Sequence, residues 1–211
     1  MPVPPASPRP ASPGPVPPRP APPGPVPPRP APPAAGQPPA AARPWLPAEE
    51  YIRTVANATM YACLLLTDER DRPLQLRTSQ PEHPQTWQLP GGNVEHGQTP
   101  WQTALRETAE ETGLDLTGRP RLLAVHFLLP GPAWPVPRVG FLFDGGRLTD
   151  RQIAAVRLDP AEHSHVEVRS LAQWRPLMEP EQWRLLAAAH RARGTGSTAY
   201  LSDTDTTSND G

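Results

Sequence analysis

Three glutamates lie close together in the sequence, and their spacing has chemical consequences. Glu107, Glu110 and Glu111 stand at positions i, i+3 and i+4, so on a helix their carboxylates share one face. Like charges at this spacing repel one another, and a cation between them would remove the repulsion. Clustered carboxylate oxygens suit Mg²⁺ or Mn²⁺ better than Zn²⁺. The cluster therefore indicates a divalent metal site; the alternative is an ordinary acidic helix surface.

A helix from Pro100 to Thr112 is expected to carry these acids. Thr99 and Gln102 have the spacing of a capping box, proline suits the first helical position, and Gly113 is a typical left-handed stop. The face opposite the acids is expected to be buried; it carries Trp101, Ala104, Leu105, Thr108 and Ala109.

Two glycines precede this helix and favour the metal site over the acidic surface. Gly91 and Gly92 follow a short expected strand, Trp87–Leu89, and should form a tight loop whose backbone approaches a ligand closely. A loop packed over the carboxylate face would create a pocket. Within such a pocket the clustered oxygens would need a cation.

The segment from Gly92 to Leu114 resembles the Nudix box, G-x5-E-x7-R-E-U-x-E-E-x-G-U, in which U is a bulky apolar residue. Two positions differ from the pattern. Thr108 occupies an apolar position, and Gln98 replaces the first glutamate of the box. The glutamine removes one negative charge, but it is still able to accept a hydrogen bond from Arg106.

This resemblance implies a hydrolase that cleaves a phosphoanhydride bond in a nucleoside diphosphate linked to a group X. Glu107, Glu110 and Glu111 would hold Mg²⁺ or Mn²⁺ and serve catalysis. Arg106 would orient these glutamates, and Gly92 would shape the loop. The alternative is a catalytically impaired Nudix-fold module that binds nucleotides or regulates, with Gln98 as the first sign of lost activity. The identity of X and the oligomeric state are left open.

Further candidates lie outside the box. Glu162 is the best placed acid for an additional metal ligand or general base, as such families often recruit; the alternative is a solvated loop acid. His163 and His165 are interpreted as a surface pair, because no third ligand is near them in sequence. Trp134, in a proline-rich loop, would either stack on a nucleobase or cover the core.

Composition divides the chain into three parts. Of its 35 prolines, 22 fall within the first 47 residues. Residues 1–46 contain a ten-residue repeat and are expected to be a disordered polyproline II spacer, with a ligand for a groove-type partner domain as the alternative. Residues 47–194 should form the folded domain, and residues 195–211 a flexible tail.

The folded part is expected to belong to the α+β class, as a mixed α/β/α sandwich like that of the Nudix family. Residues 59–67 and 74–76 should form a hairpin. Further strands are expected at residues 122–129, 139–143 and 166–168, and a last helix at residues 179–193. Strands and helices that alternate in this way favour a layered domain.

Residue usage excludes several classes of protein. All 20 basic residues are arginine, so the lysines of P-loop, protein-kinase and pyridoxal sites are missing. Residues 1–46 carry four arginines and no acid, whereas the rest carries 16 arginines and 21 acids, a charge of −5. This mild acidity argues against a nucleic-acid-binding protein.

Membrane and disulfide-linked classes are also not expected. Cys63 is the only cysteine, so it has no partner for an intramolecular disulfide. No apolar run approaches the roughly 18 residues of a membrane span, and prolines stand where a signal peptide would have its apolar segment. We therefore expect a cytoplasmic protein whose partner is a nucleotide-type small molecule.

Overall fold

The computed structural model describes residues 45–80, 82, 86–132 and 134–202. The contacts divide the chain into two units, Met1–Trp45 and Leu46–Gly211, and the second contains the fold. The expected polyproline II segment lies almost wholly outside the described residues, so both of its interpretations stay predictions.

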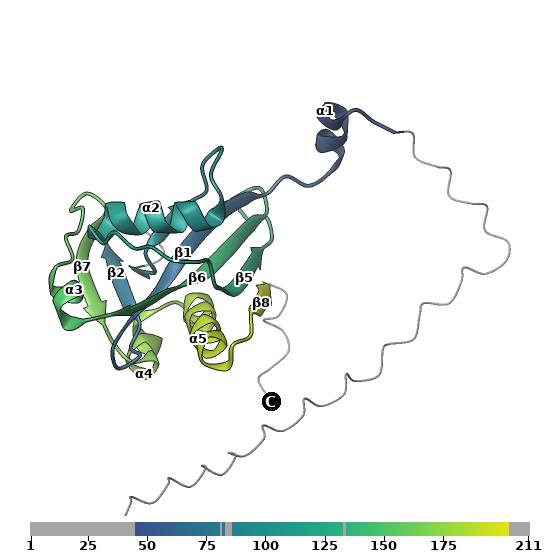
Figure 1. Cartoon of the computed structure of the whole chain (residues 1–211). Coiled ribbons are helices and arrows are strands. Elements are labelled where there is room, and N and C mark those ends of the chain that lie inside the picture. The colour runs from purple at the N-terminus through teal and green to yellow at the C-terminus, as the bar shows by residue number, and fades with distance from the viewer. Residues whose placement is uncertain (1–44, 81, 83–85, 133, 203–211) are drawn as a thin grey trace, which may run out of the picture. The chain divides into compact units, whose positions relative to one another are not determined.

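Two β-sheets lie between helices in the second unit (Figure 1). The five-stranded sheet has the order β4-β1-β6-β5-β8, and its strands are β1 (Thr59–Asp68), β4 (Gly91–Asn93), β5 (Leu122–Leu128), β6 (Arg138–Leu148) and β8 (Ala199–Ser202). The three-stranded sheet has the order β3-β2-β7, and its strands are β2 (Leu74–Thr78), β3 (Trp87–Gln88) and β7 (His163–Val168).

Two long helices cover opposite sides of these sheets, α2 (Pro100–Thr112) and α5 (Pro180–Thr195) (Figure 1). Five shorter helices complete the described elements: α1 (Ala48–Tyr51), η1 (Ile52–Thr54), α3 (Asp150–Ala154), α4 (Leu171–Trp174) and η2 (Arg175–Leu177). The mixed α+β sandwich predicted from the sequence is confirmed.

The strand β1 lies inside the five-stranded sheet and is buried on both faces, which explains its continuous run of leucines. Side chains alternate between the faces of a strand. Leu64 and Leu66 accordingly pack in the core beneath α2, together with Ala104. Leu65 points the other way and packs against Leu186 of α5. Because helices cover both faces, an uninterrupted apolar strand is favoured here over an alternating one.

The prediction that β1 and β2 form a hairpin is wrong. The two strands belong to different sheets, and a single bridge between Thr67 and Pro73 is the point where they meet. Asp68 closes the turn between them, because its carboxylate accepts hydrogen bonds from the backbone N–H groups of Arg70 and Arg72. Proline has no N–H to continue the ladder, and β2 pairs instead with β3 and β7.

The range expected to be a flexible tail contains a strand. Gly196 ends α5 in the left-handed conformation with φ of 76°, and the chain then returns to the sheet. There Ala199–Ser202 forms β8, which pairs in parallel with β5. Ala199 and Leu201 pack against the core beneath α5. The sequence did not reveal this strand, because the residues around Ala199 and Leu201 are mostly polar.

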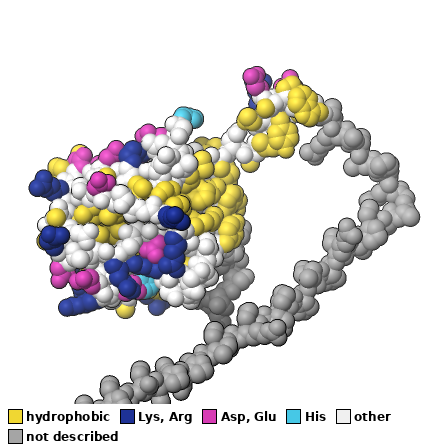
Figure 2. Space-filling view, in the orientation of Figure 1, with side chains coloured by type: hydrophobic (Ala, Val, Ile, Leu, Met, Phe, Trp, Pro, Cys, Tyr) yellow, Lys and Arg dark blue, Asp and Glu magenta, His cyan; other side chains and the backbone are white. Residues whose placement is uncertain are grey.

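Charged side chains are distributed over the surface of the folded unit. Figure 2 shows acidic and basic side chains interspersed over one face. Several arginines pair with acids, among them Arg121 with Asp144 at 3.1 Å and Arg147 with Asp71 at 3.2 Å. None of the described helices is both long and apolar enough to span a membrane.

Leu65→Ala should lower the free energy of unfolding by about 2–5 kcal/mol, because the substitution opens a cavity in a fully buried site. Urea denaturation of both proteins measures the difference. Leu129→Ala serves as the control, since Leu129 is 51% exposed and its replacement should change stability by no more than about 0.5 kcal/mol. Equal effects of the two substitutions would contradict the assignment of Leu65 to the core.

Candidate functional site

The helix α2 has the boundaries predicted from the sequence. The Thr99 side chain accepts a hydrogen bond from the Gln102 backbone N–H, and the Gln102 side chain accepts one from the Thr99 backbone. Gly113 ends the helix in the left-handed conformation with φ of 70°. Ala104 and Thr108 are buried as expected. Local capping therefore fixes the two ends of the helix that carries the acids.

The three acids of α2 differ strongly in burial. The Glu110 side chain is 59% exposed and that of Glu107 is 18% exposed, whereas that of Glu111 is only 5% exposed. Burial raises the pKa of Glu111 to about 8; the Gly91 N–H opposes this rise, and the Glu107 and Glu162 carboxylates add to it. Burial also raises the pKa of Glu107, against the neighbouring Arg106. The cluster is thus not an ordinary acidic surface.

Gly91 and Gly92 lie in the edge strand β4, not in the loop expected from the sequence. They pair with Cys63 and Ala62 of β1. The Gly91 N–H donates a hydrogen bond of 2.8 Å to the Glu111 carboxylate. A methyl group on Gly92 would lie 2.4 Å from the carboxyl carbon of Glu107. Gly92 is therefore required by the close approach of the Glu107 carboxylate, whereas a side chain on Gly91, with φ of 147°, would collide with Ala62 and Cys63 of β1.

Arg106 holds two of the acids in place. Its guanidinium lies 2.7 Å from the Glu110 carboxylate and 2.8 Å from that of Glu107. Its Nε donates to the Gln98 side-chain oxygen at 3.4 Å, so the predicted link between the loop and the helix is present. Glu95, which the sequence analysis missed, lies 3.6 Å from the same guanidinium. Glu95 therefore supplies Arg106 with a carboxylate from the same loop in which Gln98 has no charge.

Glu162 and His163 join Glu111 in a second cluster. One ligand atom from each residue lies within 4.8 Å of the others. His163 is 4% exposed, and its Nε2 lies 3.8 Å from the Glu111 carboxylate. Among the described residues its buried Nδ1 has no hydrogen-bond partner. Burial lowers the pKa of His163, against the nearby Glu162 and Asp159.

The interpretation of His163 and His165 as a surface pair is wrong for His163. Residues two apart normally share a face of a strand, but the pairing of β7 with β2 shifts between Arg77 and Thr78. This irregularity buries His163 beside the acids and leaves His165 exposed. The sequence gave no sign of the shift, because it depends on the pairing of two distant strands.

The residues present fit a divalent cation. Glu111 and Glu162 supply carboxylate oxygens and His163 supplies an imidazole nitrogen from an adjacent position. Burial raises the pKa of Glu111 and lowers that of His163, so each group is disfavoured in its charged form without a counter-ion. Mn²⁺ accepts both donor types, whereas Mg²⁺ prefers oxygen.

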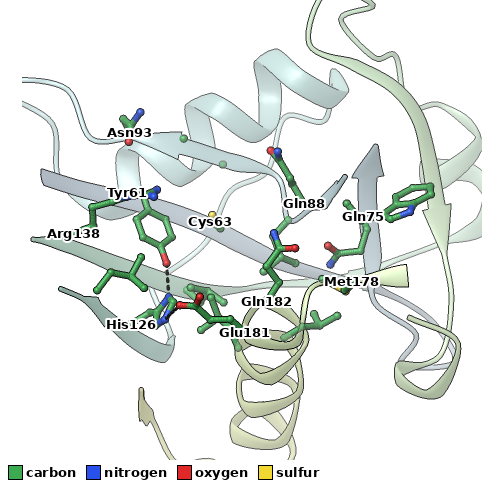
Figure 3. A pocket seen from close by; sticks show the side chains of 18 of the residues that line it. Tyr61, Cys63, Gln75, Gln88, Asn93, His126, Arg138, Met178, Glu181 and Gln182 are labelled. Carbon is green, nitrogen blue, oxygen red and sulfur yellow. Dashed lines mark hydrogen bonds and ion pairs between the residues drawn. The ribbon is translucent and has the colours of Figure 1, made fainter. Parts of the chain in front are cut away.

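A cavity of about 570 Å³ lies against β4. Gly91 and Gly92 line it, and so do residues of β1, β5, β6 and α5. Figure 3 shows the side chains that converge on it. At one end Arg138 lies over the rings of Tyr61 and Trp134, 5.1 Å from each centroid. The cavity and the acids therefore meet at β4.

Trp134 belongs to the cavity rim. It is 40% exposed, and its indole N–H donates to the Thr59 hydroxyl at 2.9 Å. The sequence allowed two positions for the Trp134 ring, stacking on a nucleobase or covering the core. Its exposure at the rim leaves the ring available to a ligand. It does not belong to either buried cluster of the core.

A chain of polar groups crosses the cavity wall and was not anticipated. The Tyr61 hydroxyl lies 2.8 Å from Nδ1 of His126, and Nε2 of the same histidine lies 3.3 Å from the Glu181 carboxylate. It thereby joins β1, β5 and α5 across one side of the cavity (Figure 3). Three residues from distant parts of the sequence give no local pattern that would have revealed it.

A family model described as the NUDIX domain matches residues 56–191. The chain belongs to the Nudix family. The box residues recognised in the sequence occupy β4, the following loop and α2, and the matched range takes in both clusters of acids.

Known proteins resemble the chain in part or in fold. A Mycobacterium tuberculosis protein named "Putative 8-oxo-dGTP diphosphatase 2" is 40% identical over 62 residues, which are 29% of this chain and 39% of that relative. The match thus spans about two fifths of the relative's length. Two solved structures share the Nudix fold. A MutT protein from Methanosarcina mazei has 23% identity and a TM-score of 0.51, covering 67% of this chain and 96% of that one. A C. elegans Ap4A hydrolase has 23% identity and a TM-score of 0.52, covering 66% and 99%.

The two departures from the Nudix box differ in their structural effects. Thr108 is fully buried, and its hydroxyl has no hydrogen-bond partner among the described residues, so it occupies the apolar position at a polar cost. Gln98 accepts hydrogen bonds from Arg106 and from the Thr103 hydroxyl. It preserves the connection between loop and helix through neutral contacts. The link between the loop and the helix therefore persists, although one charge of the box is absent.

Gly92→Ala should destabilise the protein by about 1–3 kcal/mol, because the new methyl group must displace the Glu107 carboxylate. Thermal or urea denaturation measures the loss. Gly131→Ala is the matched control, since a methyl group there meets no atom within 4 Å. If both variants unfold alike, the close packing of β4 against Glu107 is not a constraint.

Proposed function

We propose that this Nudix protein hydrolyses a phosphoanhydride bond in a nucleoside diphosphate linked to a group X, with the help of a divalent cation. The observation that carries the proposal is the buried Glu111, which accepts from the Gly91 N–H and lies beside Glu162 and His163. The strand β4, whose glycine N–H holds this acid, also lines the cavity of about 570 Å³.

Glu107, Glu110 and Glu111 are proposed to hold the cation, with Glu162 as a further ligand. A bound Mg²⁺ or Mn²⁺ would neutralise the diphosphate and stabilise the charge that develops on the leaving group. Glu111 is held by the Gly91 N–H at 2.8 Å. This contact fixes the direction of its carboxylate before any ligand arrives.

Arg106 acts as a positioning residue in this proposal. Its contacts with Glu107 and Glu110 hold both carboxylates and balance part of their charge. The Gln98 oxygen and the Glu95 carboxylate lie on the same guanidinium. The arginine therefore stays anchored to the loop although the box glutamate is missing.

In the proposed reaction a water oxygen forms a bond to phosphorus, and the bond from phosphorus to the bridging oxygen breaks. The two products each keep a phosphate. The attacking water must lose a proton, and Glu162 is the exposed acid beside the buried cluster that is placed to accept it. Glu162 thus has two candidate roles, as a cation ligand and as a general base.

The cavity is proposed to bind the nucleotide portion. Gly91 and Gly92 would lie along the phosphates, since neither residue has a side chain to obstruct the approach. Trp134 offers an aromatic face at the rim for stacking. The neighbouring Arg138 supplies a positive charge over that face, as suits an anionic ligand.

With Mg²⁺ or Mn²⁺, the purified full chain should release phosphate or a phosphorylated product from at least one member of a panel of nucleoside triphosphates, nucleotide sugars, ADP-ribose and dinucleotides. Glu111→Gln should lower kcat/KM at least about 100-fold, because even groups that only support metal ligands contribute 10- to 100-fold. Product formation is measured by chromatography.

Glu69→Gln is the matched control for this substitution, because Glu69 is an exposed turn residue and its variant should retain full activity. Unchanged turnover in Glu111→Gln would remove the proposed role of this acid. Tight nucleotide binding by the wild type without any hydrolysis would instead identify the impaired, regulatory module suggested by Gln98.

Removal of divalent ions should abolish turnover, and either Mg²⁺ or Mn²⁺ should restore it. Mn²⁺ binding to the nucleotide-free protein, followed by electron paramagnetic resonance, should weaken about 10- to 100-fold in Glu162→Gln and in His163→Gln if both side chains contribute to the cation site. The variant His165→Gln is the control, since this histidine is exposed. Equal Mn²⁺ affinity in all three variants would exclude Glu162 and His163 from the site.

A further inference from the structure

Arg138 is the arginine of the cavity wall, and its guanidinium lies over two aromatic rings. It is 5.1 Å from the ring centroid of Tyr61 and 5.1 Å from that of Trp134. All three residues line the cavity, and Figure 3 shows Arg138 beside Tyr61. A guanidinium stacks on aromatic faces through its own plane. Arg138 is therefore held more firmly than an ordinary surface arginine.

Both rings are themselves fixed by hydrogen bonds. The Trp134 indole N–H donates to the Thr59 hydroxyl at 2.9 Å, and the Tyr61 hydroxyl lies 2.8 Å from Nδ1 of His126. The Tyr61 ring also lies directly against Gly140, where an added methyl group would be 2.1 Å from a ring carbon. The two rings thus form a support for the guanidinium that exists before any ligand arrives.

No carboxylate of the described residues forms an ion pair with Arg138. Arg106 and Arg193, by contrast, lie 2.7 Å and 3.3 Å from carboxylates. The acid of the cavity wall, Glu181, lies 3.3 Å from His126. The N–H groups of a stacked guanidinium point outward in its plane, so they stay available to an acceptor. Arg138 therefore presents a positive charge to the cavity without a counter-ion from the described part of the chain.

Arg138 lies too far from β4 for one diphosphate group to reach both. Gly91 pairs with Cys63 of β1, and Arg138 of β6 pairs with Thr59 on the other side of the same strand. Two strand spacings of about 4.8 Å and four residues of about 3.3 Å each separate their backbones by roughly 16 Å. An extended arginine side chain covers less than half of this distance. A ligand whose diphosphate lies at Gly91 therefore meets Arg138 with another of its groups.

We propose that Arg138 is a specificity-determining residue that binds a second oxyanion of the ligand, separate from the diphosphate. This inference rests on the proposed function for the diphosphate at β4. It narrows the substrate class to nucleoside diphosphate derivatives that carry a further phosphate monoester or carboxylate. A planar guanidinium binds either group through two parallel N–H···O hydrogen bonds. Two sources offer this chemistry, a phosphate on the ribose of the nucleoside and a carboxylate on the group X.

The position of Arg138 in the wall makes this selection effective. Arg138 is half-buried, and a ligand in the cavity removes water from its exposed edge. A neutral group at this place would replace that water with weaker partners, so the charge would lose part of its solvation. An oxyanion restores the lost hydrogen bonds with charge-assisted ones, which are stronger. The site therefore favours the ligand with the additional charge.

Isothermal titration calorimetry on the full chain tests the proposal with two matched pairs of ligands. NADPH differs from NADH by a phosphate on a ribose, and UDP-glucuronate has a carboxylate where UDP-glucose has a hydroxymethyl group. Ca²⁺ replaces Mg²⁺ in the titrations, and chromatography afterwards checks that each ligand is intact; a pair that is hydrolysed is compared by kcat/KM instead. In at least one pair the wild type should prefer the ligand with the additional oxyanion at least about 10-fold, as expected for a hydrogen bond to a charged group. The pair that shows the preference identifies the source of the oxyanion.

Three variants assign this preference to Arg138. In Arg138→Gln it should fall to about threefold or less, while Arg138→Lys should retain part of it, since lysine keeps the charge without the planar fork. Arg175→Gln is the matched control and should keep the full preference. Arg175 also lies over a ring, that of Trp183 at 5.0 Å, but it is exposed and does not line the cavity.

The ratio of affinities within a pair separates recognition from a structural role. If Arg138 only supported the fold, Arg138→Gln would weaken both members of a pair alike and leave their ratio unchanged, and this result would overturn the proposal. The absence of any preference in the wild type, in both pairs, would overturn it as well.

The outcome is distinguishable from that of the proposed hydrolysis. An oxyanion preference that depends on Arg138, in a protein that hydrolyses no member of the substrate panel, would support the second subsite while removing the catalytic proposal. Hydrolysis of both members of each pair with equal kcat/KM, unaffected by Arg138→Gln, would support catalysis and overturn the subsite.

Discussion

A buried carboxylate held by a backbone N–H is the constraint from which the rest of the site follows. Glu111 is almost fully buried and yet lies beside two other acids, Glu107 and Glu162, which raise its pKa further. The Gly91 N–H is the contact that opposes this rise. To make it, β4 must run directly against α2, and Gly92 must leave room for the carboxylate of Glu107. The positions of the two glycines, of β4 and of the acids therefore depend on one another.

The parts of the site that could be predicted from the sequence are those encoded in consecutive residues. The capping pair Thr99 and Gln102 and the stop at Gly113 lie within a few residues of the helix ends they fix, and the structure has the same ends. The spacing of Glu107 and Glu111 follows from helical geometry alone. The contact of Gln98 with Arg106 was predicted because the box relates the two positions.

Features that depend on pairing between distant segments could not be predicted in this way. Whether β2 pairs with β1 in one sheet depends on β3 and β7, which occupy the two edges of β2 instead. The burial of His163 depends on a register shift opposite Thr78. Likewise, β8 is a strand because β5 offers it an edge. In each case the local sequence is compatible with two outcomes, and tertiary contacts decide between them.

The strand β4 also explains how the two halves of the site can differ so much in chemistry. Its glycines lie against the acids of α2 and also line the cavity, whose other described walls include α5 and none of α2. The clustered acids are therefore confined to one side, where a cation would neutralise them, whereas Arg138 and Glu181 are the charged residues of the cavity wall. The other side combines apolar walls with a small number of polar groups. A ligand with a phosphate at β4 and a ring deeper in the cavity would use both sides at once. The absence of side chains on Gly91 and Gly92 is what permits the two environments to adjoin.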